Sequence, residues 1–367
     1  MKFKIKTKTL LSGLFKVNNV VNNKSPIPSL NGIYFKLDSD QLTLIGSDSD
    51  ITIKCLIKED IEIINQGLIV IPKFIVEIIR KIDDEWVEIE LIDNSLIVIK
   101  SDKSEFKING ISADNFPNID FNLSGTKLTL DTKIISNIIH ETAFATSHEE
   151  IRPVLTGVNL FFEDNLLTCT ATDSFRLAKK QLSINADESF NINVPAKCLL
   201  EVNKLIKDNE EVNIYITNQR ILFDLEDIII QSRLINGNYP DISKLIPASF
   251  KSVLKVNKKS LQNSLDRANI LSISTSNYTV TLEKNSSQLT LSSKSQEVGS
   301  IQEIVSYDSF EGEGILISFN SKYVIEALKA LDSDDITISF NSSMDPFIIK
   351  TDDENSSTQL ILPIKTY

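Results

Sequence analysis

VIPKFIVEIIRKI, the stretch at residues 70–82, returns in altered form as NVPAKCLLEVNKLI at 193–206 and as FNSKYVIEALKALD at 319–332. In each copy the apolar residues recur at helical spacing, and a lysine stands near the start. A Pro or a Ser/Asn opens each copy, which is typical of a helix N-terminus. The copies lie about 124 residues apart, and a fixed period indicates an internal repeat. We therefore expect three related units in this chain.

A second helical pattern opens each unit, at residues 8–21, 133–147 and 258–272. Short alternating runs such as LTLIGSD (42–48) and LTCTATD (167–173) predict antiparallel strands separated by polar turns. The fold class is therefore α+β, with two helices packed on antiparallel sheets in every unit. We predict domains at 1–121, 122–250 and 251–367, and helices at 7–22, 72–82, 132–147, 195–207, 257–271 and 320–331.

The composition is that of a soluble globular protein. Of the 367 residues, 41% are hydrophobic, which is enough to build a sizeable core. The three cysteines, Cys55, Cys169 and Cys198, are odd in number and far apart, which favours reduced thiols and a cytoplasmic location. The N-terminus is interpreted as mature protein. We expect no membrane association, because no apolar run approaches the roughly 18 residues that span a bilayer.

Positive charge is concentrated on the predicted helices. They carry fourteen cations and five anions, a net charge of +9, which leaves −21 for the rest of a chain whose total is −12. Lysine is common on solvated helix faces, so this pattern has an ordinary explanation. However, Glu is as good a helix former as Lys, so helix propensity does not explain why Lys outnumbers Glu on the helices of all three units. A cationic wall of this kind suits duplex DNA held without sequence readout.

Catalytic and metal-binding motifs are missing from the sequence. It contains no nucleotide-binding, metalloprotease or hydrolase signature. The acidic runs at 47–50 and 332–335 lack the glycine and terminal glutamate of a calcium loop, which favours solvated turns. His140 and His148 are the only histidines, and no CxxC pair is present, so zinc is not expected. We predict a protein that is not an enzyme and has no metal and no cofactor.

Several motifs along the whole length resemble one known family. They are ATDSFRLA (171–178), RPVLTGV (152–158), INGNYPDISKLIP (235–247), RANILS (267–272) and LILPIKTY (360–367). Together and in this order they are similar to the bacterial DNA polymerase III beta subunit, the beta sliding clamp. The resemblance implies three clamp domains per chain and a head-to-tail homodimer that closes into a ring around duplex DNA. It implies a processivity factor that tethers the replicative polymerase.

The resemblance also implies an apolar pocket between the second and third domains. The pocket would receive a short peptide, often Gln-Leu-x-Leu-Phe, from the DNA polymerase III catalytic subunit, the clamp loader, and other polymerases and repair factors. Without the resemblance, core packing is the favoured explanation for the apolar members. Phe175 stands where the family often has His, which predicts a more apolar wall. The pocket residues are Arg152, Leu155, Thr172, Ser174, Phe175, Arg176, Leu177, Pro240, Leu245, Met344, Pro346, Leu360, Ile361, Leu362, Pro363 and Ile364.

Two further sets of residues follow from the resemblance. Glu149 stands where some members have Gln and would repel phosphate, while Pro153 and Val154 replace tyrosines of some members. Ionic partners at the subunit contact are fewer than in some relatives, which predicts a dimer that relies more on apolar burial and is less sensitive to salt. The DNA-binding set is Lys24, Lys73, Arg80, Glu149, Pro153, Val154, Lys197 and Lys204, and the dimer set is Lys103, Phe106, Ile270, Leu271, Glu297 and Glu303.

The residues alone leave a second class of protein open. An acidic scaffold built from repeats, which recruits other proteins and never touches DNA, would share the composition and the repeat. The two classes differ in one property, which is topological retention on circular DNA.

Overall fold

The computed structural model describes residues 1–22, 24–186, 188–208, 210–272, 278–285, 287–351 and 357–365. The chain forms two compact units. The first contains residues 1–133 and 197–234, and the second contains residues 134–196 and 235–367. Each unit is described by itself.

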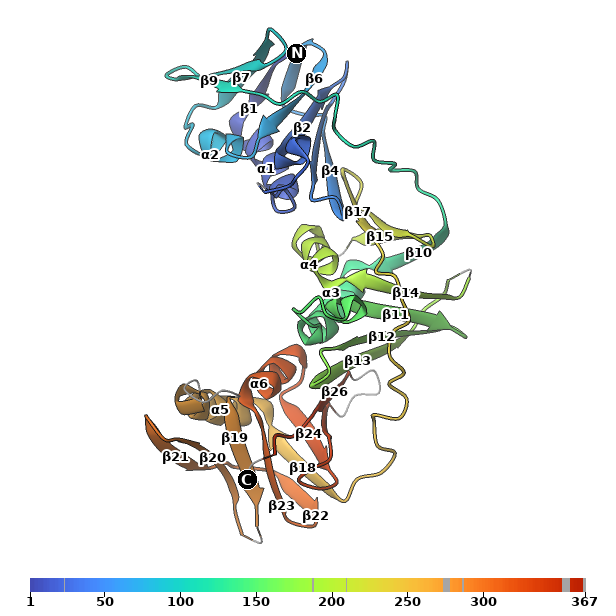
Figure 1. The fold of residues 1–367 in the computed structure, drawn as a ribbon, viewed down its shortest axis with the longest axis vertical. Coiled ribbons are helices and arrows are strands. Elements are labelled where there is room, and N and C mark those ends of the chain that lie inside the picture. The colour runs from blue at the N-terminus through green and yellow to red at the C-terminus, as the bar shows by residue number, and fades with distance from the viewer. Residues whose placement is uncertain are drawn as a thin grey trace. The chain divides into compact units, whose positions relative to one another are not determined.

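The first unit holds two antiparallel sheets and two helices that pack together, α1 and α2 (Figure 1). One sheet has five strands in the order β5-β1-β7-β8-β9, and the other has eight in the order β10-β15-β16-β17-β4-β3-β2-β6. Its elements are β1 Lys2–Lys6, α1 Thr7–Asn18, β2 Gly32–Leu37, β3 Leu42–Ser47, β4 Ile51–Ile57, β5 Ile61–Asn65, β6 Gly67–Pro72, α2 Ile75–Arg80, β7 Trp86–Ile92, β8 Leu96–Lys100, β9 Glu105–Asn109, β10 Thr126–Asp131, α4 Ala196–Leu205, β15 Glu211–Ile216, β16 Arg220–Asp224 and β17 Ile228–Arg233.

Helix α1 lies against β3 and β4 at very short range. Its buried face carries Leu10, Leu14 and Val17. A Cβ at Gly46 of β3 would lie 2.1 Å from the carbonyl oxygen of Val17. Only glycine tolerates this approach, so Gly46 sets how closely the helix sits on the sheet.

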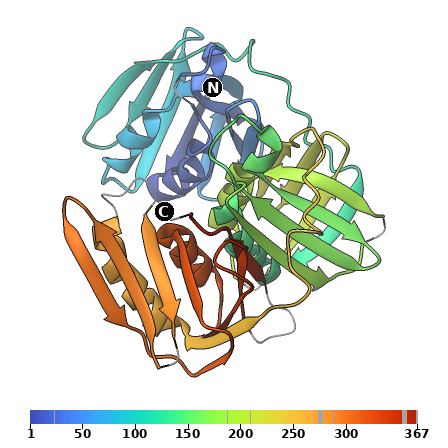
Figure 2. The same ribbon diagram turned by 60° about the horizontal axis from the view of Figure 1, so that its bottom comes forward.

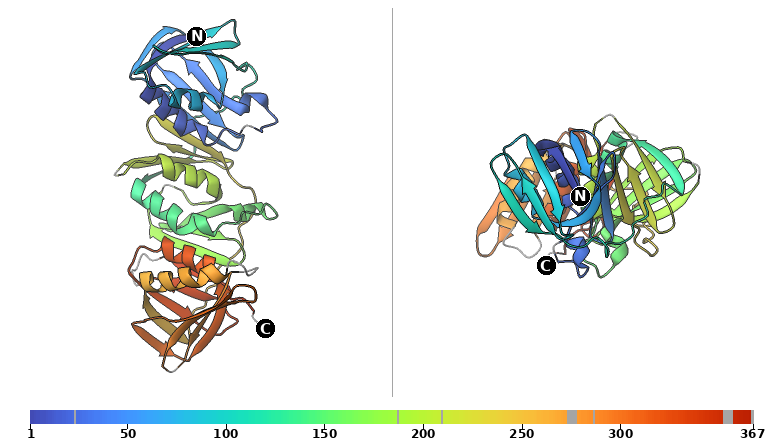
Figure 3. Two further views of the ribbon diagram at one scale, coloured as in Figure 1. Left: turned by 90° about the vertical axis from the view of Figure 1, so that its left-hand side faces the viewer. Right: turned by 90° about the horizontal axis from the view of Figure 1, so that it is seen from above.

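The second unit also holds two antiparallel sheets. A nine-stranded sheet runs β14-β11-β12-β13-β26-β25-β24-β18-β22, and a four-stranded sheet, orange at the lower left of Figure 2, runs β21-β20-β19-β23. Helices α5 and α6 lie side by side (Figure 3). Its elements are α3 Thr132–Thr142, β11 Gly157–Glu163, β12 Leu166–Thr172, β13 Arg176–Ser183, β14 Phe190–Pro195, β18 Ser252–Asn257, α5 Lys258–Ser272, β19 Thr279–Lys284, β20 Leu289–Ser295, β21 Gly299–Ile304, β22 Ser309–Gly312, β23 Ile315–Asn320, α6 Ser321–Ala330, β24 Asp335–Phe340, β25 Phe347–Lys350 and β26 Thr358–Ile361.

Strands from different repeats share these sheets. In the first unit β17 pairs with β4, with Ile230 opposite Ile53. In the second unit β13 pairs with β26, with Leu177 opposite Leu360. Neighbouring repeats therefore extend one another's sheets at both places.

All six predicted helices are present, but most are shorter than predicted. Helix α1 ends at Asn18, and α2 begins only at Ile75, because Pro72 still belongs to strand β6. The third helix changes to a 3₁₀ turn at Ala143–Ala145. Apolar periodicity continues past these ends because the following turns also bury side chains, such as Val20 and Ala145.

Candidate functional site

A small apolar cluster lies on the nine-stranded sheet, apart from the main core of the second unit. Leu177 of β13, Leu360 of β26 and Ile348 of β25 form its buried base. They share one row because Leu360 is opposite both Leu177 and Ile348 in the two strand pairs, so their side chains lie on one face. The half-buried residues that cover this base are Ile242, Ile246, Phe250 and Leu362.

Three further apolar side chains, close in sequence to members of this cluster, are exposed at the surface. Leu245 is 46% exposed, Met344 is 52% exposed and Phe175 is 60% exposed. Pro240 is also exposed, and Pro346 and Pro363 are half-buried. Clustered exposed apolar residues of this kind mark contact sites for partners. We call the buried base, its cover and these exposed residues the apolar groove.

Some predicted pocket residues have a different role. Leu155 is 3% exposed, and the side chain of Ile361 belongs to the main core of the second unit. The prediction missed Ile242, Ile246, Phe250 and Ile348. The signal for three of them was present in ISKLIPASF at 242–250, whose apolar residues are spaced to face one side.

The turn between β12 and β13 holds Phe175 at the surface. The Asp173 carboxylate accepts hydrogen bonds from the backbone N–H groups of Phe175 and Arg176 at 2.9 and 3.0 Å. Ser174 has a φ of 77°, which non-glycine residues rarely adopt. The hydroxyl of Thr172 donates to the Arg176 carbonyl at 2.6 Å, which closes the turn. These hydrogen bonds fix the backbone of the turn, and the ring of Phe175 therefore stays at the surface.

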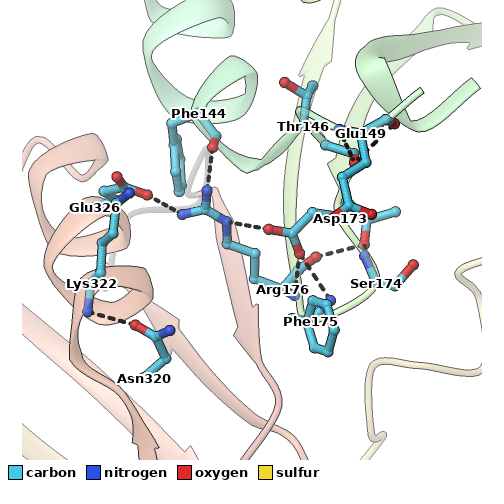
Figure 4. Close-up of polar contacts among 12 residues, drawn as sticks. Phe144, Thr146, Glu149, Asp173, Ser174, Phe175, Arg176, Asn320, Lys322 and Glu326 are labelled. Carbon is cyan, nitrogen blue, oxygen red and sulfur yellow. Dashed lines mark hydrogen bonds and ion pairs between the residues drawn. The ribbon is translucent and has the colours of Figure 1, made fainter. Parts of the chain in front are cut away.

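Arg176 is not free to meet a peptide, contrary to expectation. Its side chain is 6% exposed, and its guanidinium donates to Asp173 at 3.0 Å, to the Phe144 carbonyl at 2.6 Å and to Glu326 of α6 (Figure 4). The Tyr323 ring lies 4.6 Å from the guanidinium carbon. Every nitrogen of the guanidinium is thus engaged inside the protein, and Arg176 joins β13 to α6. Arg152, in contrast, is exposed.

The segment after β26 crosses from this turn to the four-stranded sheet. The Leu362 N–H donates to the Phe175 carbonyl at 2.9 Å, and the Ile364 N–H donates to the Ser318 carbonyl of β23 at 2.7 Å. Next to it lies a cavity of about 460 Å³ whose lining includes Met344 and Ile364. The C-terminal segment therefore contributes Leu362 to the cover of the apolar cluster and is held at both ends.

The predicted DNA-binding cations differ in how exposed they are and in whether their charged groups already have a partner. Lys73 is only half-exposed, because its ammonium donates to the Val21 carbonyl at 2.8 Å. Burial, with a smaller effect from Lys197, lowers its pKa. The Lys73 ammonium thus already has an acceptor within the chain, and its contact with DNA stays a prediction. Lys24 lies in an exposed turn.

Three other cations pair with carboxylates yet stay exposed. Arg80 pairs with Glu77 on α2. Lys197 pairs with Asp48, and Lys204 pairs with Glu201 at 2.7 Å, with side chains 58% and 57% exposed. The Asp48 and Glu201 carboxylates are largely buried, whereas the ammonium groups of Lys197 and Lys204 stay accessible to phosphate.

The loop before β11 holds the other three residues of the predicted DNA-binding set. Glu149 is exposed, and its backbone N–H donates to the Ser147 hydroxyl at 3.0 Å. Pro153 begins a 3₁₀ turn at Pro153–Thr156, where its missing N–H costs nothing. Val154 is half-buried beside Gly237.

The residues predicted for a subunit contact lie at two sheet edges and near the end of helix α5. Phe106 is half-buried on β9, the last strand of the five-stranded sheet, and Lys103 is in the exposed turn before it. Ile270 is 68% exposed near the end of α5, beside the half-buried Leu271. Glu297 and Glu303 belong to the turn and edge strand at β21. The prediction missed Val298 and Ile304 at the same edge, which are 59% and 63% exposed.

Glu303 has a partner within its own chain. Its carboxylate accepts hydrogen bonds from the Arg267 guanidinium, one of them at 2.9 Å, and from the Ser264 hydroxyl at 2.7 Å. The hydrogen bonds from Arg267, more than those from Ser264, lower the Glu303 pKa to about 2. Glu303 was expected to offer a charge to a second subunit, but this pairing already satisfies it.

Acid should weaken the α5–β21 contact through Glu303. Because the folded pKa is depressed, the stabilisation is complete above pH ~4.5 and is lost as the pH falls toward ~2. We expect the unfolding free energy of the wild type to fall more steeply over this range than that of Glu303→Gln. Urea unfolding at several pH values measures this difference. Glu297→Gln, at an exposed turn position, serves as the control. Equal slopes for the wild type and Glu303→Gln would contradict the prediction.

Comparison with known proteins covers the whole chain. Residues 1–120, 129–241 and 243–365 match the family models of the DNA polymerase III beta subunit N-terminal, central and C-terminal domains. The chain belongs to the DNA polymerase III beta subunit family. Within this family it is 39% identical to the beta sliding clamp of Bacillus subtilis and 38% identical to that of Staphylococcus epidermidis, with 100% of each chain covered.

Solved structures of the family agree with the fold. The DNA polymerase sliding clamp from Bacillus subtilis has a TM-score of 0.95 at 39% identity, and the beta chain from Streptococcus pneumoniae has 0.95 at 35%. Each comparison covers 100% of both chains. The resemblance seen in the sequence and the three-domain α+β fold class are therefore confirmed. In the part of the chain that the structure describes, no helix is long and apolar enough to cross a membrane.

Proposed function

We propose that this chain is a sliding clamp that encircles duplex DNA and tethers the replicative DNA polymerase as a processivity factor. The observation that carries the proposal is the family match along all three domains together with similarity to proteins named beta sliding clamp. The function is topological, since the ring holds the polymerase near DNA while it slides. The clamp carries out no catalysis and needs no metal or cofactor.

Free sheet edges support a closed ring made of two copies. Strand β9 ends the five-stranded sheet and β21 ends the four-stranded sheet, and neither has an outer neighbour among the described residues. Open edges with exposed apolar side chains are unstable unless something covers them. A head-to-tail contact of β9 with β21 of a second copy satisfies both edges. Two such contacts close the ring, so that every β9 edge and every β21 edge is paired.

Exposed cations on the helices support duplex DNA as the occupant of the ring. Lys197 and Lys204 of α4 are largely exposed, and their present partners are carboxylates of the same chain. Each phosphate contact releases counterions, and many weak contacts hold the duplex without fixing a sequence register. Loose contacts of this kind allow sliding.

The apolar groove supports the recruitment of partners through short peptides. Its buried base at Leu177, Ile348 and Leu360 offers a place for an apolar anchor, and flexible Met344 adapts to different anchors. The DNA polymerase III catalytic subunit, the clamp loader, and other polymerases and repair factors would compete for this one groove. The middle and third domains supply its two sides.

Capture on circular DNA distinguishes a clamp from a scaffold that never touches DNA. The chain, incubated with a clamp loader, ATP and nicked circular DNA, should elute with the circles in gel filtration. Linearising the same circles with a restriction enzyme should release it, because a ring leaves through an open end. Retention on linear DNA, or no capture on circles, would refute the proposal.

A further inference from the structure

A cleft between α1 and α4 combines cations with an exposed aromatic ring. The cleft has a volume of about 560 Å³ and contains no carboxylate in its lining. A second cleft shares Lys8, Ser12 and Lys16 with the first, and its lining also includes Glu59, Asp60 and Asp227. The lining of the first cleft is Lys8, Leu11, Ser12, Phe15, Lys16, Asn19, Lys204 and Leu205.

Phe15 is exposed because of its position on α1. The buried face of the helix takes Leu10, Leu14 and Val17, and Phe15 is 45% exposed beside it. A large aromatic ring gains much by burial, so its exposure on a cationic face needs an explanation. The ring has no ordered aromatic partner among the described residues.

Glu201 orders the α4 side of the cleft. Its carboxylate accepts hydrogen bonds from the Asn19 amide at 3.2 Å and from the Lys204 ammonium at 2.7 Å. Glu201 itself is 6% exposed, so a buried carboxylate holds the side chains of Asn19 and Lys204 in the cleft lining. Lys8 is exposed and Lys16 is half-exposed, and neither has an ion-pair partner in the described part of the chain.

We propose that this cleft binds unpaired nucleotides of DNA, with a base stacked on Phe15 and the flanking phosphates on Lys8, Lys16 and Lys204. Proteins that bind single strands combine an aromatic platform with a cationic track. A duplex offers phosphates but keeps its base faces inside the stack, so it can use the lysines and cannot use the ring. The proposal rests on the proposed function, because it assigns this cleft to DNA within or next to the ring.

Fluorescence anisotropy with a labelled oligo(dT) strand and a duplex of equal length tests the proposal. Phe15→Ala should weaken binding of the single strand by roughly 5- to 100-fold, since stacking contributes about 1–3 kcal/mol per base. Duplex binding should change by less than about 2-fold, and Phe15→Tyr should keep single-strand binding. The control is Phe161→Ala, a ring 38% exposed on β11. Equal effects of Phe15→Ala on single strand and duplex, or an effect no larger than that of Phe161→Ala, would overturn the proposal.

Two further measurements identify the cause of a failure. Lys8→Ala and Lys16→Ala should each reduce the salt dependence of oligo(dT) binding, by about 0.7 in the slope of log K against log salt. An unchanged slope would remove the lysines from the proposed track. Phe15→Ala should still be captured on nicked circles by the clamp loader. If the wild type is not captured, the clamp function itself fails, whereas capture of both proteins with equal oligo(dT) affinity refutes only the nucleotide site.

Discussion

Replacement of Arg176 by Met is expected to lower the unfolding free energy by about 3 kcal/mol. Removal of one partner from a buried ionic network leaves the other charges without compensation. Here Asp173 and Glu326, with side chains 14% and 30% exposed, would lose their cation, and the Phe144 carbonyl would lose its donor. The methyl thioether fills similar space, so the loss reflects charge and hydrogen bonding more than an empty cavity. Urea unfolding followed by circular dichroism measures it.

Arg152 provides a matched control in the same predicted pocket. It is exposed, and Arg152→Ala should change the unfolding free energy by no more than about 0.5 kcal/mol. If Arg152 contacts a bound peptide, as the family resemblance implies, this variant should still lower affinity for a fluorescent Gln-Leu-x-Leu-Phe peptide. A loss of less than about 1 kcal/mol for Arg176→Met would show that the network is not stabilising.

Substitution of Ile270 by Asp is expected to weaken the dimer by about 100-fold or more. Ile270 is 68% exposed in the single chain, and Val298 and Ile304 on the neighbouring edge are also open. If this patch is buried by a second copy, a new carboxylate there must be desolvated without a partner, which costs several kcal/mol. Sedimentation velocity over a range of concentrations measures the shift from dimer to monomer.

A second exposed edge position and a salt series make this test specific. Leu316→Asp, at a 56% exposed position on β23, should leave the dimer intact, because β23 is the opposite edge of the same sheet. The wild-type dimer should change little between low and high salt, since Glu303 is already paired with Arg267. Strong dissociation with rising salt, or an unaffected dimer in Ile270→Asp, would contradict an apolar contact.

The repeat made the fold predictable. Three copies of one helical pattern and the alternating runs between them indicated two helices and antiparallel sheets per repeat, and these elements are present. Helix ends were less predictable, because burial continues into the turns. The pairing of β17 with β4 and of β13 with β26 joins residues far apart in sequence. Local patterns predict such strands but do not identify their neighbours.

The candidate site was predictable where its residues are apolar and exposed, as at Phe175, Leu245 and Met344. The site was less predictable where a charged side chain forms its hydrogen bonds within the protein. Arg176 and Lys73 have the sequence character of ligand-binding cations, yet their nitrogens are used by Glu326 and by the Val21 carbonyl. Those acceptors are distant in sequence, so only the folded chain reveals them. Resemblance to a family transfers positions, whereas the hydrogen bonds depend on each chain's own neighbours.

The shared sheets bear on how a closed ring would admit DNA. Within the chain, each junction between repeats is an uninterrupted ladder, through β17 and β4 in one unit and through β13 and β26 in the other. Separating either ladder breaks several backbone hydrogen bonds at once and exposes the apolar rows beside them. A gap for a double helix therefore opens at lower cost where the two polypeptides meet. In the proposed ring, a loader protein would act on that seam alone, and each protomer would keep its internal strand pairings during loading.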